Sequence, residues 1–499
     1  MKYIIGIDGG TTRIKAVLFD AAGHEIDKIV VENEQIKNGV RVELDMKKFW
    51  EKTAACVKHL MKVGPAEPDD ILAVGVTGQG EGLWTLSKEK EPIYNAILWN
   101  DGRAQKEAKA VNEKTPGIGK LIHRNLGTPV DAGSTLLLLK WMKANRADIY
   151  RQIRTIFFAK DWLRFCMTDE LSTDYTDGGP SYLKIADGLP AQQVLTILDL
   201  KEVIDWIPPV KEAGSVSGFL TIEAAEQMGL NAGQPVVTGA MDVVASALGS
   251  GAISTGDVSV ILGTTCVVEV VKNRKSCDFA RCKKHYLRHT AEEMIIDITS
   301  TLNGMKNVDW AFKEIARTSN GGVVEGIIRE TEPGSGGVIY HPYLSEIGER
   351  APFNHYDACA SFFGIRSGTT KGELLRSVYE GLAYSVRDCL EEVEGVKRIL
   401  LSGGGANSEL LTQIIADVTG LQIVIGNGTE FGAKGAAMTA SVAVGFYEDY
   451  PDVVHRWCHI RKIVRPHRIE AYEKNYTLYR ELRTAFAPLW KRRAELLGE

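Results

Sequence analysis

Apolar residues at the start of the chain follow the two-residue period of β-strands. They predict strands over 3–8, 14–20 and 25–31, with Gly9-Gly10-Thr11-Thr12 turning between the first two. After Asp45, a favourable N-cap, apolar residues recur at helical spacing through Met61. A further strand over 71–77 runs into Gly78-Gln79-Gly80. This order of elements predicts an α/β layer.

A similar pattern recurs in the second half of the chain. It predicts a strand over 257–262, a turn at Gly263-Thr264-Thr265 and a strand over 266–271. The two hairpins form a weak internal repeat, which suggests two copies of one fold. Further on, the pattern predicts strands over 396–401 and 422–425 and a helix over 408–419. The last predicted element is a charged amphipathic helix over 470–498, kinked or interrupted at Pro488.

Length and composition narrow the class of protein. A chain of 499 residues exceeds what one hydrophobic core usually organises, so two domains are expected. Its 44% hydrophobic and 25% charged residues are typical of globular enzymes. The net charge of −5 argues against a nucleic-acid or membrane-surface partner. The apolar runs are strand-length, and the N-terminus does not resemble a signal peptide, so we expect a cytoplasmic protein.

The cysteines suggest reduced thiols rather than a disulfide framework, because six of the eight lie singly within apolar stretches. Cys277, Cys282, His285 and His289 are four potential zinc ligands in one short segment. Their spacing fits no common zinc module, and Arg and Lys residues lie among them. We therefore interpret this segment as a solvated basic loop between two strands, and its role stays open.

Three glycine-rich turns suggest phosphoryl transfer, although the chain has neither a Walker A sequence nor Gly-x-Gly-x-x-Gly. Asp8-Gly9-Gly10-Thr11-Thr12 combines a carboxylate for Mg²⁺ with turn amides for phosphate oxygens. Gly263-Thr264-Thr265 is a second such turn. In Gly403-Gly404-Gly405 the absence of side chains lets a nucleotide lie against the backbone between a strand and a helix. Each alone is a common turn, but together they favour nucleotide binding.

This order of turns resembles the actin-like ATPase superfamily and, within it, the FGGY carbohydrate kinases. The most specific match is Ala360-Ser361-Phe362-Phe363-Gly364-Ile365 followed by Glu373-Leu374-Leu375-Arg376-Ser377-Val378-Tyr379-Glu380. Lys140-Trp141, Lys160-Asp161-Trp162, Thr173-Asp174 and the run from Pro342 to Pro352 also lie where the family's sequence blocks fall. The resemblance covers essentially the whole chain.

The resemblance implies two RNase H-like domains of the actin/hexokinase type, with ATP and substrate bound in an interdomain cleft. The domains would span 1–245 and 246–499. It implies ATP and Mg²⁺ as cofactors, with Asp8 holding Mg²⁺ directly or through water. The implied ATP-binding residues are Asp8, Gly10, Thr11, Thr12, Lys15, Gly263, Thr264, Thr265, Gly403, Gly404, Gly405 and Asn407.

The resemblance assigns the catalytic base to Asp242, which follows a predicted strand over 235–238 and begins a helix rich in small residues. A carboxylate there can accept the proton of the attacking hydroxyl as the γ-phosphoryl group moves. Spacing alone would favour an ordinary helix N-cap aspartate. The family match shifts the interpretation to the base.

The implied substrate pocket comprises Gln79, Gly80, Glu81 and Trp84, together with Trp99, Asn100, Asp101, Gly102 and Arg103, and Asp242. Carboxylates and amides bind vicinal hydroxyls, and an aromatic ring covers the carbon chain. Glycerol kinases of this family have Arg-Glu where this chain has Gly80-Glu81, which suggests open space and a longer uncharged substrate. This segment looks most like erythritol kinases, followed by L-xylulose kinases.

The predicted function is therefore ATP-dependent phosphorylation of a terminal hydroxyl of a small polyol or ketose. Erythritol is the first candidate, and L-xylulose or D-xylulose is the alternative. A different class, an actin-fold ATPase or sugar sensor without kinase activity, would not need Asp242 or the polar residues around Glu81. The stereoisomer, the hydroxyl that is phosphorylated and the oligomeric state, including a homodimer, stay open.

Overall fold

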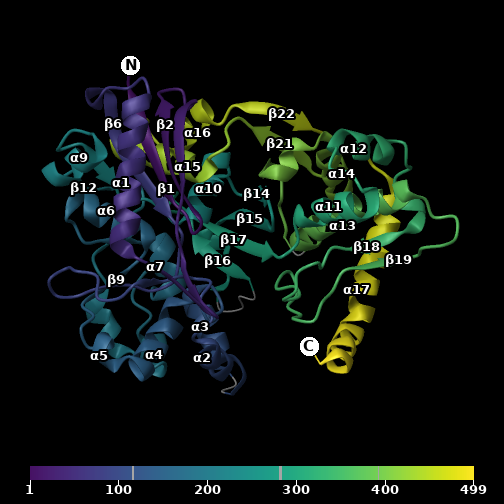
Figure 1. The fold of residues 1–499 in the computed structure, drawn as a ribbon, viewed down its shortest axis with the longest axis horizontal. Helices are drawn as coiled ribbons and strands as arrows, with labels where there is room; N and C mark the ends of the chain where they lie inside the picture. The colour runs from purple at the N-terminus through teal and green to yellow at the C-terminus, as the bar shows by residue number, and fades with distance from the viewer. Residues whose placement is uncertain (115–116, 280–283, 392, 499) are drawn as a thin grey trace. The chain divides into compact units, whose positions relative to one another are not determined.

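The computed structural model describes residues 1–499 except 115–116, 280–283, 392 and 499 (Figure 1). The chain divides into two compact units, each discontinuous in sequence. Unit 1 contains Met1–Ser254, Val271–Asp297 and Gly428–His459; unit 2 contains Thr255–Val270, Ile298–Asn427 and Ile460–Glu499. The predicted boundary at residue 245 cuts the sequence once, whereas the chain passes between the units several times.

Unit 1 is built on a six-stranded sheet in the order β12-β13-β6-β1-β2-β3. The predicted N-terminal strands are confirmed as β1 (Tyr3–Gly9), β2 (Arg13–Asp20), β3 (Glu25–Glu32) and β6 (Ile71–Gly78). The strands β12 (Val216–Phe219) and β13 (Pro235–Val237) complete the sheet. β1 pairs antiparallel with β2 and parallel with β6, and β6 pairs parallel with β13.

Helices cover both faces of this sheet, as the alternation of side chains along β1 requires. Ile5 and Ile7 pack with α1 (Met46–Val63), α6 (Ala159–Thr168) and α9 (Ile222–Met228). Ile4 faces the opposite way, toward α10 (Asp242–Ser250), α15 (Phe431–Ala443) and α16 (Tyr450–Trp457). The predicted N-cap is confirmed, because Asp45 accepts hydrogen bonds from the first-turn amides of α1.

The helix α15 approaches the sheet closely at two glycines. A Cβ atom on Gly6 would lie 2.8 Å from the carbonyl carbon of Ala433, and one on Gly75 would lie 2.5 Å from that of Ala436. Such distances exclude any side chain at either position. The helix therefore belongs to the core of unit 1, although its sequence follows most of unit 2.

A third apolar cluster in unit 1 is mainly helical. It joins α3 (Ile118–Leu126), α4 (Thr135–Asn145), α5 (Ala147–Tyr150) and α8 (Gln192–Ile197). Short strands accompany these helices: β4 (Ile36–Asn38), β5 (Arg41–Leu44), β7 (Trp84–Leu86), β8 (Ala96–Ile97) and β9 (Thr155–Phe157). They carry the loops that contain the predicted substrate residues.

Unit 2 repeats the connectivity of the first sheet. Its strands are β14 (Asp257–Leu262), β15 (Cys266–Asn273, entering unit 1 after Val270), β20 (Arg398–Ser402), β21 (Gln422–Gly426) and β22 (Ile460–Val464). β14 pairs antiparallel with β15 and parallel with β20, β20 pairs parallel with β21, and β21 pairs antiparallel with β22. The same sequence of pairings links β2, β1, β6, β13 and β12, which supports the interpretation of the internal repeat.

The helices of unit 2 pack against this sheet in one large apolar cluster. It includes α13 (Lys371–Leu390), α14 (Glu409–Thr419) and α17 (Glu470–Leu497). Thr370 and Glu373 form a capping box at the start of α13. Of the two predicted effects of Pro488, an interruption of the last helix is wrong, because α17 continues through it, and a kink stays a prediction. Among the described residues, no helix combines the length and apolar character needed to cross a membrane.

Candidate functional site

The first hairpin brings Asp8 and Lys15 together, because the two residues are partners in the β1–β2 ladder. Asp8 is only 8% exposed, and its Oδ2 atom lies 3.1 Å from Nζ of Lys15. The same ammonium lies 3.1 Å from Oε2 of Glu430, the residue before α15. Burial raises the pKa of Asp8, and the charge of Lys15 opposes that shift. The cluster holds a carboxylate and a cation beside the predicted phosphate hairpin.

Side chains from the loop after β3 hold the hairpin through its carbonyl groups. Asn33 Nδ2 donates to the carbonyl of Gly10, and Gln35 Nε2 donates to that of Thr11, each at 2.9 Å. The backbone amide of Asn33 donates to the carbonyl of Thr12 at 2.9 Å. Three successive carbonyls are thus engaged. The amides of such a turn are the groups that meet phosphate oxygens.

The hairpin is also linked to residues predicted to bind substrate. The indole Nε1 of Trp99 donates to Oγ1 of Thr11 at 3.0 Å, and that hydroxyl donates to Oε1 of Gln79 at 3.0 Å. Trp99 is 40% exposed, whereas Gln79 is buried. The structure therefore brings Thr11, Gln79 and Trp99 into one hydrogen-bonded group.

Asp242 is the first residue of α10, and Met241 rather than Asp242 occupies the N-cap position. Its carboxylate accepts a hydrogen bond from the amide of Val243 at 2.8 Å. Asp242 is half-buried. Burial and, secondarily, the negative charge of Asp8 raise its pKa from 3.8 to about 7. A carboxyl group that titrates near neutral pH can accept a proton during turnover and release it afterwards.

The space predicted at Gly80 is filled by Met241. A Cβ atom on Gly80 would lie 2.7 Å from both Cγ and Sδ of Met241, whose side chain is buried. The prediction that Gly80 leaves open space is therefore wrong, because the methionine before Asp242 fills it. The next residue, Glu81, has a left-handed backbone with φ of 55°, which is uncommon for a residue other than glycine.

The remaining predicted substrate residues differ in exposure. Asn100 is exposed, as is Trp99. Trp84 is 0% exposed and packs in the core, with its ring 5.6 Å from that of Phe49. Asp101 is buried, and it accepts hydrogen bonds from the amide of Val42 at 2.6 Å and from Nε of Arg103 at 2.8 Å. These placements favour a packing role for Trp84 and a loop-fixing role for Asp101.

In unit 2, the second hairpin lies against the glycine-rich loop. Gly263 donates its amide to the carbonyl of Thr265 at 2.9 Å, and Thr264 is exposed at the turn. A Cβ atom on Gly403 would lie 3.2 Å from the amide nitrogen of Gly263. Gly403 has φ of 82°, a conformation that favours glycine. Gly404 is exposed beside it, and Gly405 is buried. The predicted phosphate and adenosine segments of unit 2 are therefore adjacent.

A cavity of about 310 Å³ opens beside this loop. Asn407, the last predicted ATP-binding residue, is one of its lining residues, and the others are Ala406, Glu409, Thr412, Ile425, Arg461 and Lys462. Lys462 lies 2.6 Å from Glu409, so the rim of the cavity contains an ion pair.

Glu430 has a place in the site that was not predicted from the sequence. It contacts both Lys15 and Lys28, the latter at 2.9 Å. It lies more than four hundred positions after its partners, and no local pattern connects it with them. Arg103, which was predicted as part of the substrate pocket, is buried and contacts Asp101 and Glu43, at 2.8 Å and 2.7 Å.

The donor atoms around Asp8 fit Mg²⁺ that arrives with a nucleotide. Among the described residues, no group of three or more His, Cys, Asp or Glu side chains could hold a metal by itself. Mg²⁺ usually takes one or two carboxylates and fills its remaining positions with phosphates and water. Buried Asp8 beside a phosphate hairpin suits that pattern.

The segment from Cys277 to His289 lies partly outside the described residues, because Cys282 is among 280–283. His285 begins β16 (His285–Arg288) rather than a loop. His289 is buried, with Nε2 3.0 Å from the carbonyl of Ala252 and Nδ1 accepting from the amide of Ala291 at 3.0 Å. Burial lowers its pKa to about 4. Both ring nitrogens of His289 are therefore engaged within the protein.

Comparisons with known proteins identify the family to which this chain belongs. Residues 3–249 match the N-terminal domain of the FGGY family of carbohydrate kinases, and residues 258–444 match its C-terminal domain. The chain belongs to this family: it is a carbohydrate or polyol kinase with two domains of the actin-like ATPase fold. ATP is the phosphate donor in this family. The alternative of a non-catalytic ATPase or sugar sensor is thereby set aside.

The relatives act on several small sugars and polyols, according to their names. A probable L-xylulose kinase of Haemophilus influenzae is 31% identical, over 89% of this chain and 91% of its own length. The erythritol kinase of Brucella abortus is 27% identical, with 98% of each chain covered. Among solved structures, the ligand-bound xylulose kinase from Lactobacillus acidophilus matches with a TM-score of 0.90 at 24% identity, over 99% of this chain and 100% of that one.

Proposed function

We propose that the enzyme transfers the γ-phosphoryl group of ATP to a terminal hydroxyl of a linear four- or five-carbon polyol or ketose. The observation that carries the proposal is the half-buried carboxyl of Asp242, with a pKa of about 7, in the same unit as the Asp8–Lys15 pair. Asp242 would accept the proton of the attacking hydroxyl. Phosphoryl transfer needs little else from the protein beyond positioning and charge stabilisation.

Asp8 would hold Mg²⁺, directly or through water, and Mg²⁺ would neutralise charge on the phosphates when bound. Lys15 would lie beside the transferred group. The proposed phosphate contacts in the first hairpin are Gly10, Thr11 and Thr12. The other proposed nucleotide-binding residues are Gly263, Thr264, Thr265, Gly403, Gly404, Gly405 and Asn407.

The proposed substrate contacts are Glu81 and Asn100, with the exposed ring of Trp99 over the carbon chain. Gln79 is buried and bonded to Thr11, so it would order the pocket from behind. Identities of 31% and 27% to the L-xylulose and erythritol relatives do not separate the two substrates. We therefore treat both as candidates, with D-xylulose as a third.

A substrate screen tests the proposal. Purified enzyme is mixed with ATP, Mg²⁺ and one of erythritol, L-xylulose, D-xylulose or glycerol, and ADP release is measured. We expect one of the first three to give the highest kcat/KM, with product formation equal to ADP release. Preference for glycerol, or ADP release that no sugar changes, would contradict the proposal.

A further inference from the structure

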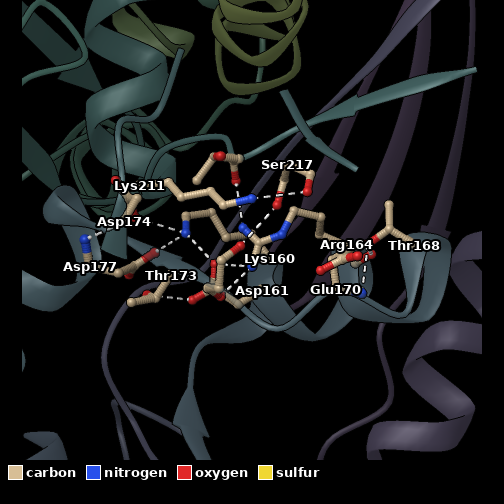
Figure 2. Close-up of polar contacts among 12 residues, drawn as sticks. Lys160, Asp161, Arg164, Thr168, Glu170, Thr173, Asp174, Asp177, Lys211 and Ser217 are labelled. Atoms are coloured by element: carbon tan, nitrogen blue, oxygen red, sulfur yellow. Dashed lines mark hydrogen bonds and ion pairs between the residues drawn. The ribbon is translucent and has the colours of Figure 1, made fainter. Parts of the chain in front are cut away.

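A buried cluster of five charged side chains lies beneath the segment that carries Asp242. Lys160 lies 2.6 Å from Asp161, 2.8 Å from Asp174 and 3.1 Å from Asp177. Arg164 lies 3.3 Å from Asp161. All five side chains are 0% exposed. Figure 2 shows Lys160 and Arg164 converging on the acidic side chains.

The charges of this cluster can balance within the protein. Burial opposes the charge on Lys160, but the three carboxylates around it raise its pKa. Burial raises the pKa of Asp177 well above its usual value and so favours its neutral form. With Asp177 neutral, two cations face two carboxylates. A buried cluster of this kind tends to define a geometry rather than to add stability.

The cluster fixes the first turn of α7 (Tyr175–Ser181). Asp174 is the N-cap of this helix and accepts hydrogen bonds from the amides of Thr176, at 2.8 Å, and Asp177, at 3.4 Å. Lys160 contacts Oδ1 of the same Asp174. The position of Thr176 is thereby tied to the charge cluster.

Thr176 connects this turn to the segment before Asp242. Its Oγ1 accepts a hydrogen bond from the amide of Met241 at 2.8 Å, in a buried setting. Arg164 also donates to the carbonyl of Thr238, at 3.3 Å. On the other side, Thr77 donates to the carbonyl of Ala240 at 2.6 Å. The amide of Met241 and the carbonyl of Ala240 belong to the same peptide, so these two hydrogen bonds fix the backbone one residue before Asp242.

We propose that Thr176, held by the Lys160–Asp174 ion pair, is a positioning residue that sets the place of the Asp242 carboxylate through the Met241 amide. The proposal rests on the proposed role of Asp242 as the base. Proton transfer requires the carboxylate within hydrogen-bond reach of the substrate hydroxyl. Displacement by about 1 Å reduces turnover by on the order of 10².

Thr176→Val is the central test, because valine keeps the shape of threonine and removes the acceptor. We expect kcat to fall by about tenfold to a hundredfold, with the KM values for sugar and ATP nearly unchanged. Thr176→Ser should restore kcat. Thr53→Val is the matched control, since Thr53 is equally buried and its hydroxyl donates to the carbonyl of Phe49 at 2.7 Å within α1, outside the charge cluster. Equal losses of kcat in the two valine variants would overturn the proposal.

Amide hydrogen exchange gives a second readout that does not depend on turnover. Exchange in the peptide over 238–242 should accelerate in Thr176→Val and stay slow in Thr53→Val. If Asp242→Asn retains full activity, the base assignment fails, while the exchange data still decide whether Thr176 holds the segment. In the Asp242→Asn background, Thr176→Val should reduce turnover little further.

Should Thr176→Val not fold, Thr176→Ala removes the same acceptor. Wild-type kcat and wild-type exchange rates in that variant would refute the proposal.

Discussion

The ammonium of Lys15 lies 3.1 Å from a carboxylate oxygen of Asp8 and 3.1 Å from one of Glu430. Lys28 contacts the same Glu430 at 2.9 Å but has no such contact with Asp8 among the described ion pairs. Lys15→Met should therefore raise the KM for ATP and lower kcat, because it removes the cation beside the phosphate hairpin. Lys28→Met is the matched control, and it should change the KM for ATP and kcat far less. Steady-state kinetics with ATP as the varied substrate measure the difference.

Asp8→Asn should weaken the use of Mg²⁺ and leave sugar binding nearly unchanged. Asparagine keeps the size of the side chain but removes the negative charge that attracts the metal. The Mg²⁺ concentration for half-maximal activity should rise several-fold at saturating sugar. An unchanged Mg²⁺ dependence would remove Asp8 from this role.

Asp242→Asn should lower kcat by roughly 10²–10⁴, the usual range for a lost general base. In the wild type, kcat/KM should fall as the pH drops below about 7, the pKa of Asp242, because only the ionised carboxylate can accept the proton. The pKa of Asp242 is higher in the folded chain than the ordinary 3.8, so this group reduces stability as the pH rises from about 3.8 to about 7, and the loss remains constant above pH 7. The asparagine variant should therefore have a Tm at pH 8 no lower than the wild type. A pH profile that is flat from 5.5 to 8 would argue against Asp242 as the base.

Gly80→Ala should lower kcat, because its Cβ would lie 2.7 Å from Cγ and Sδ of Met241. Relief of the clash would shift Met241 and, with it, the start of α10. A second substitution, Met241→Ala, should recover part of the loss by freeing that space. The comparison of the two single variants with the double variant measures the coupling. Independent, additive effects would show that the methionine does not transmit the change.

Glu81→Gln should raise the KM for the sugar and leave that for ATP nearly constant, since it removes the charge of the proposed acceptor of substrate hydroxyls. Asp101→Asn is the control from the neighbouring loop, where the carboxylate is paired with Arg103 and the amide of Val42. That variant should lower Tm instead. If Glu81→Gln lowers Tm and leaves the sugar KM unchanged, Glu81 has a structural role in the turn.

The sequence predicted the strands, the hairpins and the family because these depend on local periodicity and on contiguous motifs. It could not predict that Met241 fills the space at Gly80, since that depends on side-chain packing between segments distant in sequence. Glu430 was missed for the same reason. Trp84 and Trp99 look alike as aromatic residues near a polar loop, yet one is 0% and the other 40% exposed. Whether a single aromatic side chain is buried or exposed depends on tertiary packing, which the local sequence does not show.

The position of α15 also affects how the protein is made. At typical rates of synthesis, the ribosome needs about 7 to 26 seconds to pass from residue 298 to residue 427, after which α15 emerges. During that interval the sheet face around Ile4, Phe19 and Val237 lacks α15 and α16, and α10 is the only one of its three covering helices already synthesised. A nascent chain in this state offers an apolar surface to chaperones and to aggregation. A stop codon just after residue 427 would thus damage the core that was synthesised first.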